Sequence, residues 1–244
     1  MNSRIMFLGA VACTAMIANA GTTVVDFENG TEGWEGPQGF GGVSYVDPTG
    51  GVGGGAGYRT QFHDFGIAFT NSTNAAFVGD FSPYQGVTFS VDLKVDQIGT
   101  FFPVPRPFML ELRDFDTAQG GYPWSSVFYL FDWVSQDTYA DFTTLSVTID
   151  NTTSPVLPSG WGGYGSYDPN TFETMLPDGV TFADILSGVD EIAFSTLLPD
   201  YFFTDDDYDM TIDNVTVTTV VPAPAAPALL AFGGLLASRR RRTA

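Results

Sequence analysis

Strict alternation of apolar and polar residues in two short segments is the feature that most constrains the fold of this chain. In the segment VTFSVDLKV, residues 87–95, every odd position is apolar and every even position is polar. The segment LSVTI, residues 145–149, repeats the pattern. A side-chain period of two belongs to a strand with one buried face, so both segments are predicted to be half-buried β-strands.

Several other segments rich in β-branched and aromatic residues are also predicted to be strands. These segments are 23–27, 43–46, 66–70, 108–113, 127–134, 191–195 and 211–218. One short helix is predicted over 182–187, with Thr181 as its N-cap and Asp184 at its third position. Roughly eight to ten short strands, separated by glycine-rich loops, predict an all-β fold: an antiparallel β-sandwich of the jelly-roll kind.

The first 20 residues have the pattern of a secretory signal peptide. Arg4 precedes an apolar run over 5–17, and Ala18-Asn19-Ala20 supplies the small residues that signal peptidase recognises. We therefore expect export, with cleavage after Ala20. One alternative is a membrane anchor, which the short apolar run disfavours. The other is a lipoprotein signal ending at Cys13, although the residues before it lack the usual leucine.

The last 25 residues combine a proline linker, an apolar stretch over 229–237 and a basic block. A helix over 227–238 would span about 18 Å, short of a bilayer core of about 30 Å. The basic block places the preceding chain outside the cytoplasmic membrane. The prolines are Pro222, Pro224 and Pro227, and the basic block is Arg239, Arg240, Arg241 and Arg242.

This tail, residues 220–244, resembles the PEP-CTERM sorting signal of Gram-negative bacteria, with Ala223 where that family usually has glutamate. The resemblance implies a short membrane helix and an envelope-sorting transpeptidase of the exosortase type as a partner. It also implies delivery to the cell envelope, cell surface or extracellular matrix of a Gram-negative-type bacterium. It implies nothing about the ectodomain, residues 21–219.

The ectodomain is strongly acidic. It carries four basic side chains against 28 acidic ones, a formal charge of −24. Nucleic acid is excluded as a partner because its recognition needs a basic surface, and direct docking on anionic lipid is disfavoured for the same reason. Divalent cations and a hydrated polysaccharide matrix remain compatible. Cys13 lies in the signal peptide, so the mature chain has no disulfide.

The segments VDFENGTEGW, residues 25–34, and TIDNVTVT, residues 211–218, resemble the first and last strands of jelly-roll carbohydrate-binding modules and laminin-G-like domains. In the resembled modules, calcium lies between these strands, which implies Ca²⁺ at Asp26, Glu28 and Asp213. Asp213 is in phase with Val215 and Val217 and is therefore expected to face the core. The alternative is that these acids form turns or a solvated loop.

Aromatic residues in glycine-rich segments predict a sugar-binding surface. Glycines cannot cover the rings in PSGWGGYGSYDPN, residues 158–170, so some of these rings are expected to be exposed. The segment GGYPW, residues 120–124, is a second candidate. The predicted glycan-binding residues are Trp161, Tyr164, Tyr167, Asp168 and Asn170, with Tyr122 and Trp124. The alternative is that the rings fold back as lids on the sandwich; Trp34 and Trp133 are predicted to be core residues.

Catalytic motifs are weak. The only histidine, His63, stands in RTQFHDFG without a nucleophile-elbow motif. The carboxylates of ELRDFD, residues 111–116, lack the spacing of sandwich-fold glycosidases. The favoured function is therefore a non-catalytic surface or matrix protein that binds calcium and polysaccharide. The alternatives are an extracellular carbohydrate-active enzyme, either a glycosidase or a lyase, and a purely structural or adhesive surface protein.

Overall fold

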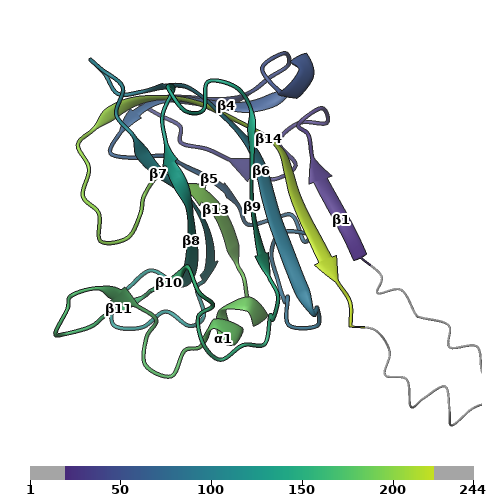
Figure 1. Ribbon diagram of the computed structural model, residues 1–244, viewed down its shortest axis with the longest axis vertical. Coiled ribbons are helices and arrows are strands. Elements are labelled where there is room, and N and C mark those ends of the chain that lie inside the picture. The colour runs from purple at the N-terminus through teal and green to yellow at the C-terminus, as the bar shows by residue number, and fades with distance from the viewer. Residues whose placement is uncertain (1–19, 223–244) are drawn as a thin grey trace, which may run out of the picture.

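The computed structural model describes residues 20–222, which form two stacked antiparallel β-sheets and one short helix (Figure 1). The predicted antiparallel β-sandwich is confirmed. The predicted signal peptide, residues 1–20, lies outside the described residues except for Ala20, and the predicted sorting tail, residues 220–244, lies outside them except for residues 220–222. Among the described residues, no helix has the length and hydrophobicity needed to cross a bilayer.

The first sheet, called the β14 sheet, has the strand order β3-β4-β14-β6-β9, and β1 also pairs with β14. On one edge β14 pairs with β6. On its other edge it pairs with β4 along its first half and with β1 along its second half. The strands are β1 (Ala20–Val25), β3 (Gly42–Asp47), β4 (Gly57–Asp64), β6 (Gly86–Ile98), β9 (Thr143–Ile149) and β14 (Asp206–Val220).

The second sheet, called the β7 sheet, has the strand order β10-β8-β7-β13-β5-β2. Its strands are β2 (Trp34–Glu35), β5 (Ala68–Asn71), β7 (Arg106–Asp114), β8 (Ser125–Val134), β10 (Trp161–Tyr164) and β13 (Glu191–Ser195). The remaining elements are the 3-10 turn η1 (Val52–Gly54), the hairpin strands β11 (Ser166–Tyr167) and β12 (Thr174–Met175), and the helix α1 (Phe182–Ser187).

Each predicted strand overlaps an observed strand, but β4, which has eight residues, was not predicted. The alternating segments 87–95 and 145–149 lie within β6 and β9, and the odd residues of β6 are buried from Val87 to Val95. The helix α1 covers the predicted range. Thr181 accepts a hydrogen bond from the backbone of Asp184, whose side chain accepts one in return from the backbone of Thr181. This capping box satisfies two backbone N–H donors at the start of the helix.

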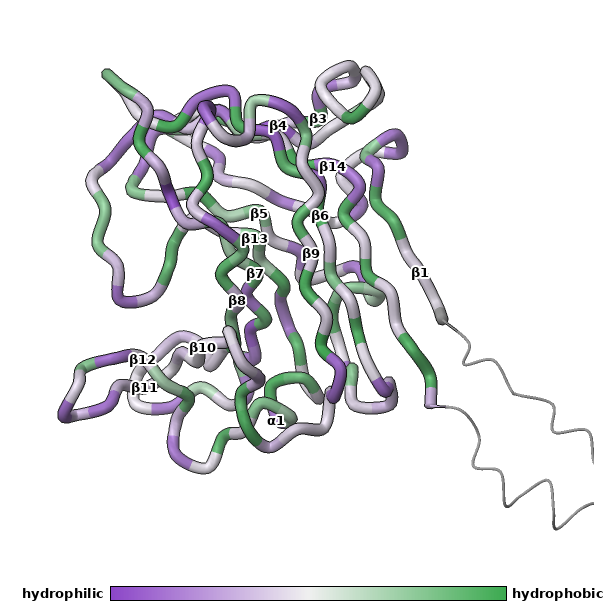
Figure 2. The backbone as a smooth tube through the Cα atoms, viewed as in Figure 1, coloured by the Kyte–Doolittle hydropathy of each residue, from purple (hydrophilic) through white to green (hydrophobic). Residues whose placement is uncertain are grey.

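The core lies between the two sheets, where Figure 2 shows green stretches of β7, β8 and β13 in the middle of the molecule, interrupted by purple at their charged residues. Phe194 of β13 is at its centre. Its ring centroid lies 5.6 Å from Trp34, 6.1 Å from Phe108 and 6.3 Å from Phe131. Trp34 is a core residue, as predicted. Trp133 is not: the buried Val134 takes the inward position, so the half-buried Trp133 contacts Tyr201 instead.

We expect Phe194→Ala to lower the free energy of unfolding by about 3–5 kcal/mol, because it removes a fully buried ring contacted by three others. Urea denaturation of the purified protein measures the loss. The matched control is Phe202→Ala, since Phe202 is 91% exposed, and that variant should unfold like the parent. Equal midpoints for the two variants would contradict this assignment of the core.

Candidate functional site

The outer face of the β7 sheet, which points away from the β14 sheet, is buried along β7. A strand at the surface of a sandwich normally exposes every second side chain, but all nine residues of β7 are buried. Leu110 and Leu112 belong to the core, so Glu111 and Arg113 point outward. The β11–β12 hairpin and the segment between β13 and β14 project beyond this face at opposite ends of the strands (Figure 1).

Three charged side chains form an ion-pair network on this outer face. The Arg113 guanidinium contacts Oε2 of Glu111 and Oε1 of Glu191, each at 2.6 Å. Burial disfavours the charge on Arg113, but the attraction of the two glutamates outweighs it and holds the pKa of Arg113 above its usual value. Arg113 therefore stays charged at neutral pH, with the carboxylates of Glu111 and Glu191 on either side of its single guanidinium.

Trp124 lies over this network in a fixed orientation. Its indole Nε1 donates to Oε1 of Glu111 at 3.0 Å, and the guanidinium carbon of Arg113 lies 4.3 Å from its ring centroid. The second contact is a cation–π interaction. Ser126 donates to the same glutamate oxygen at 2.6 Å. Because one contact acts at the ring edge and the other on the ring face, the plane of the indole is determined by its neighbours.

Tyr122 and Tyr164 join Trp124 in an aromatic cluster, called the Trp124 cluster below. The rings of Tyr164 and Trp124 are 6.1 Å apart, and those of Tyr122 and Tyr164 are 5.3 Å apart at 84°. All three side chains are half-buried. Burial raises the pKa of the Tyr164 phenol, so this hydroxyl keeps its proton at neutral pH and can donate a hydrogen bond. The structure thus brings together three of the residues predicted to bind glycans.

Trp161 lies apart from this cluster. It belongs to β10 rather than to an exposed loop, and alternation along the strand points it into the sandwich while Tyr164 points out. It is 9% exposed and packs against Tyr129 and Phe182. Trp161 therefore follows the alternative in which the rings of this segment fold back on the sandwich, because the segment contains a strand, β10, that the sequence pattern did not indicate.

Tyr167 and Asp168 are not stacked on the Trp124 cluster, although Tyr167 lines a small pocket together with Tyr122 of that cluster. Tyr167 is exposed on the β11–β12 hairpin and stacks on Phe172, with 6.5 Å between ring centroids. Asp168 accepts the backbone N–H of Asn170 at 2.7 Å, which lowers its pKa and stabilises the turn. A role for these residues in glycan binding stays a prediction.

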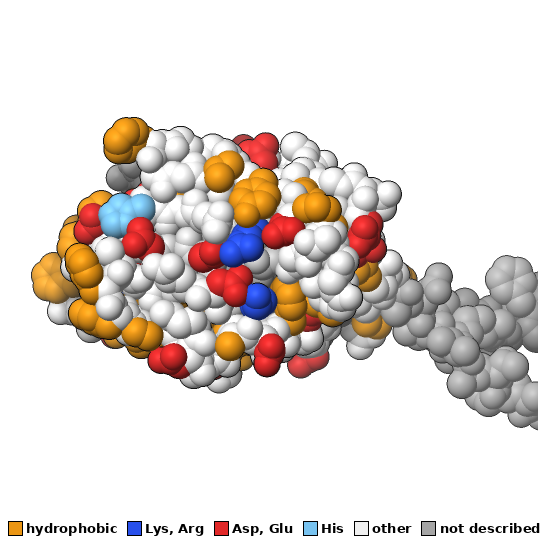
Figure 3. All heavy atoms as spheres, turned by 90° about the horizontal axis from the view of Figure 1, so that it is seen from above, with side chains coloured by type: hydrophobic (Ala, Val, Ile, Leu, Met, Phe, Trp, Pro, Cys, Tyr) orange, Lys and Arg blue, Asp and Glu red, His pale blue; other side chains and the backbone are white. Residues whose placement is uncertain are grey.

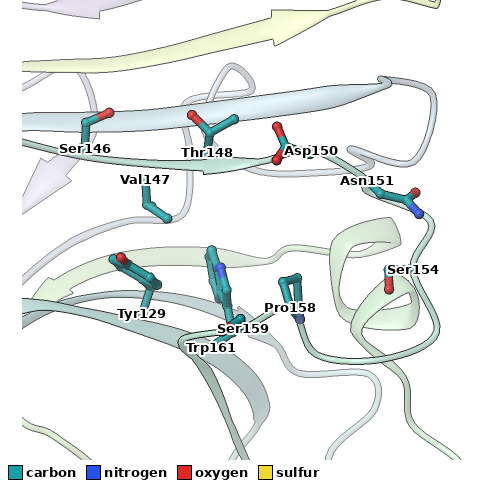
Figure 4. A pocket seen from close by; sticks show the side chains of 10 residues that line it. All are labelled: Tyr129, Ser146, Val147, Thr148, Asp150, Asn151, Ser154, Pro158, Ser159 and Trp161. Atoms are coloured by element: carbon teal, nitrogen blue, oxygen red, sulfur yellow. The ribbon is translucent and has the colours of Figure 1, made fainter.

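A pocket of about 490 Å³ lies where the edge of the β14 sheet faces the edge of the β7 sheet (Figure 4). Tyr129 and Trp161 rise into it from one side, and Val147 of β9 points toward them from the other. Asp150 and Asn151 also line it, beyond the end of β9. The small exposed part of Trp161 therefore faces this pocket rather than the outer face of the β7 sheet.

Asp213, one of the predicted calcium ligands, points away from the core. It pairs with Asp92 of β6, and the expectation that it shares the phase of Val215 and Val217 is wrong. The register between β14 and β6 shifts after Asp213, where Asn214 has φ +46°, and this bulge reverses the alternation. Asp213 is nevertheless 3% exposed, because the segment 51–56 covers it.

Two of the three predicted calcium ligands hold this segment by its backbone. Asp213 accepts the N–H of Val52 and Glu28 accepts that of Ala56, both at 2.8 Å. Burial raises the pKa of Asp213, and the nearby carboxylates of Asp92 and Asp26 add to the increase. Within residues 20–222 no three carboxylate, histidine or cysteine side chains converge as a metal-binding group. The observed geometry is that of a backbone clasp, and calcium at these residues stays a prediction.

His63 and Asp114, the last residue of β7, have structural partners. Figure 3 shows the histidine between two carboxylates, and its ring nitrogens lie 2.8 Å from Asp207 and 3.2 Å from Asp205. These acids raise the pKa of His63, the Asp207 hydrogen bond most of all. Asp114 is buried and accepts the backbone N–H groups of Asp116 and of Thr117, at 2.8 and 3.1 Å. Burial raises the pKa of Asp114, and its contacts are those of a turn.

Sequence reasoning missed Arg113 and Glu191 as site residues. The available signal was composition: with four basic residues in an ectodomain of 28 acids, an arginine at an outward position of a predicted strand needs carboxylate partners. Composition could not identify Glu191 as the partner, because this residue is distant in sequence and lies beside Arg113 only through the pairing of β13 with β7.

Comparison with known proteins found no matching protein-family model and no match among curated proteins. Among solved structures, the chain is similar to the family 11 carbohydrate-binding module of a Clostridium thermocellum cellulosomal cellulase: 14% identity, TM-score 0.46, covering 84% of this chain and 98% of that one. It is also similar to the CBM22-1–GH10 modules of a xylanase from that organism, at 13% identity and TM-score 0.45, covering 83% of this chain but 29% of that one. A family 30 carbohydrate-binding module gives 12% identity and TM-score 0.44, covering 80% of this chain and 92% of that one.

We expect Asp92→Asn to raise the free energy of unfolding at pH 7 by about 0.5 kcal/mol in the presence of chelator, because it removes a like charge opposite Asp213. The asparagine can accept from Asn214 with its oxygen and donate through its nitrogen to the hydroxyl of Thr144, whose hydrogen bond then reverses direction. Because the pKa of Asp213 is raised in the fold, its contribution to stability is full below the unfolded value of about 3.9 and is lost as pH rises through the folded value. The gain from Asp92→Asn should therefore vanish at acidic pH.

Denaturation of the two proteins at both pH values, with and without calcium, checks this expectation. If Asp26, Glu28 and Asp213 hold calcium, the ion stabilises the parent by about 2.7 kcal/mol at a hundredfold excess over its dissociation constant, and Asp213→Ala abolishes the gain. A parent protein indifferent to calcium would rule out the metal site. If the Asp92→Asn variant is less stable than its parent in the presence of chelator, the like-charge interpretation is contradicted.

Proposed function

We propose that this chain is an exported, non-catalytic polysaccharide-binding protein of the bacterial envelope, and that the Trp124 cluster contacts the sugar. The observation that carries the proposal is the fixed indole of Trp124, held at its edge by Glu111 and on its face by Arg113. A ring that is held in place before binding loses little conformational entropy when a ligand arrives.

The chemistry of the cluster suits a sugar. Indole and phenol rings present flat apolar surfaces for the C–H faces of a pyranose, and phenol hydroxyls can exchange hydrogen bonds with sugar hydroxyls. Tyr122 and Tyr164 place two such hydroxyl-bearing rings beside Trp124. An apolar surface bordered by a few polar groups is the usual composition of a small-molecule or glycan site.

Charge favours a neutral polysaccharide. Within the described residues, every lysine and arginine already contacts at least one carboxylate, so no basic side chain is left to neutralise a uronic acid or a sulfate group. The closest contacts are Arg59 with Asp209 at 2.7 Å, Lys94 with Asp96 at 2.7 Å, Arg113 with Glu111 at 2.6 Å, and Arg106 with Asp206. An acidic polymer would therefore need a divalent cation as a bridge.

The two carboxylates beneath the cluster are better suited to support than to catalysis. Glu111 accepts hydrogen bonds from Arg113, Trp124 and Ser126, and Glu191 is bound by the same arginine. A general acid or base must reach the proton that it transfers, whereas both of these carboxylates are occupied by donors of the protein itself. This arrangement supports a binding protein over the alternative of a glycosidase or lyase.

Export, sorting and calcium complete the proposal. The predicted signal peptide would deliver the chain across the cytoplasmic membrane, and an exosortase-like transpeptidase would act on the predicted tail. An exopolysaccharide of the envelope or matrix would then be the ligand. The formal charge of −24 on the ectodomain is compatible with surroundings rich in calcium and hydrated polymer.

We expect Trp124→Ala to weaken binding of a neutral polysaccharide at least about tenfold, as truncation of a central aromatic contact does in other interfaces. Affinity electrophoresis against a panel of neutral glucans, xylans and mannans identifies the ligand, and titration calorimetry measures the loss. Trp124→Phe keeps a ring but loses the hydrogen bond to Glu111, so its affinity should be intermediate. Phe202→Ala is the matched control, because it removes an exposed ring away from the cluster.

If Trp124→Ala binds polysaccharide as well as the parent does, the assignment of the site is wrong. If the parent binds no polysaccharide of the panel, the proposed function is wrong. The same panel with alginate and polygalacturonate tests the ligand class. The protein should not bind either acidic polymer in the presence of chelator, and any binding to them should require calcium. Strong binding to an acidic polymer in chelator would contradict the charge argument.

A further inference from the structure

The free edge of β9 is long and unprotected. β9 ends the strand order of its sheet and pairs with β6 alone within the described residues. Its seven residues contain no charged side chain and no proline, and its register with β6 is regular. Such an edge presents free backbone N–H and C=O groups, which proteins usually protect with lysine, proline or a bulge. The edge strands of the β7 sheet are much shorter: β2 has two residues and β10 has four.

The pocket of about 490 Å³ runs along this same edge. It is lined by Ser146, Val147 and Thr148 of β9 and, on the opposite side, by Tyr129 and Trp161. Figure 4 shows Val147 pointing toward the two aromatic rings, while Ser146 and Thr148 point away from them. A strand laid against β9 would therefore send alternate side chains into the space above Tyr129 and Trp161.

We propose that β9 is a docking edge for an extended peptide segment of a partner protein, which extends the β14 sheet by one strand and fills this pocket with its inward side chains. In this mode of recognition, main-chain hydrogen bonds supply affinity and the pocket selects the alternate side chains. The site is distinct from the Trp124 cluster, because Trp161 and Tyr164 point to opposite faces of β10.

Charge at the two ends of β9 defines the partner. Asp141 precedes the strand and Asp150 follows it, and both side chains are exposed. An uncharged strand between two acids is complementary to an uncharged peptide with lysine or arginine at both ends. A second copy of this chain fits poorly: antiparallel pairing of β9 with its equivalent would bring Asp141 of one molecule close to Asp150 of the other, adding to the repulsion between two bodies of charge −24.

The test uses ¹⁵N-labelled protein and a synthetic, end-blocked peptide of sequence KTVTVTVTK. We expect the amide resonances of residues 143–149 to shift on titration, with the indole resonance of Trp161 and without that of Trp124. Two further peptides carry N-methyl groups on one or the other alternating set of backbone nitrogens. The peptide whose N-methyl groups replace the N–H groups that face β9 should bind at least about tenfold more weakly, because several hydrogen bonds are lost.

A charge exchange tests the partner's chemistry. The double variant Asp141→Lys/Asp150→Lys should lose the lysine-ended peptide and bind its glutamate-ended counterpart, ETVTVTVTE. The matched control, Glu173→Lys/Asp178→Lys, changes two exposed acids elsewhere and should behave like the parent.

The proposal is overturned if the lysine-ended peptide leaves residues 143–149 unshifted, or if both N-methylated peptides bind as well as the parent peptide, since attraction would then be electrostatic only. It is also overturned if a neutral oligosaccharide shifts these residues and the peptide does not, because the pocket would then be a glycan site. Binding of polysaccharide at Trp124 is scored separately by Trp124→Ala, so either proposal can fail without the other.

Discussion

The hydrogen bonding of β14 is the interaction on which the rest of the structure depends. This strand pairs with β6 on one side and, on the other, with β4 and then β1. It therefore joins the start of the chain to its end and fixes the register of four strands at once. The change of partner from β4 to β1 coincides with the bulge at Asp213 and Asn214, where the segment 51–56 is clasped by carboxylates. A single irregularity in one strand thus positions a covering segment far away in sequence.

The sequence predicted local structure well because local structure here follows a short-range pattern. The alternation in 87–95 and the cap at Thr181 act within a few residues of the chain, and both appear as expected. Prediction failed where a distant segment decides the outcome. The bulge after Asp213 reverses the faces of the residues that follow, so period-two reasoning across it gives the wrong side. The strand of Trp161 could not be predicted, because it exists only through pairing with β8.

The candidate site could be predicted in part for the same reason. Trp124 and Tyr164 are visible in the sequence as aromatics in glycine-rich segments, but nothing local indicates that they meet. They meet because β10 pairs with β8, which sets Tyr164 opposite Ser126, two residues after Trp124. The charges below them come from β7 and β13, again through register. Composition indicated that basic groups were scarce, and the fold places one of those few beneath the indole.

The position of β14 also determines how the body resists mechanical load. Ala20 and Val220 are direct partners across β1 and β14, so the chain enters and leaves the sandwich at the same end (Figure 1). A force that reaches the body through the residues after Val220 pulls along the axis of β14. Because this strand has neighbours on both sides, it can be extracted only by shearing the hydrogen bonds of both edges together, rather than by peeling them off one at a time. The fold therefore makes the strand that such a force would load first one that is hydrogen-bonded along both of its edges.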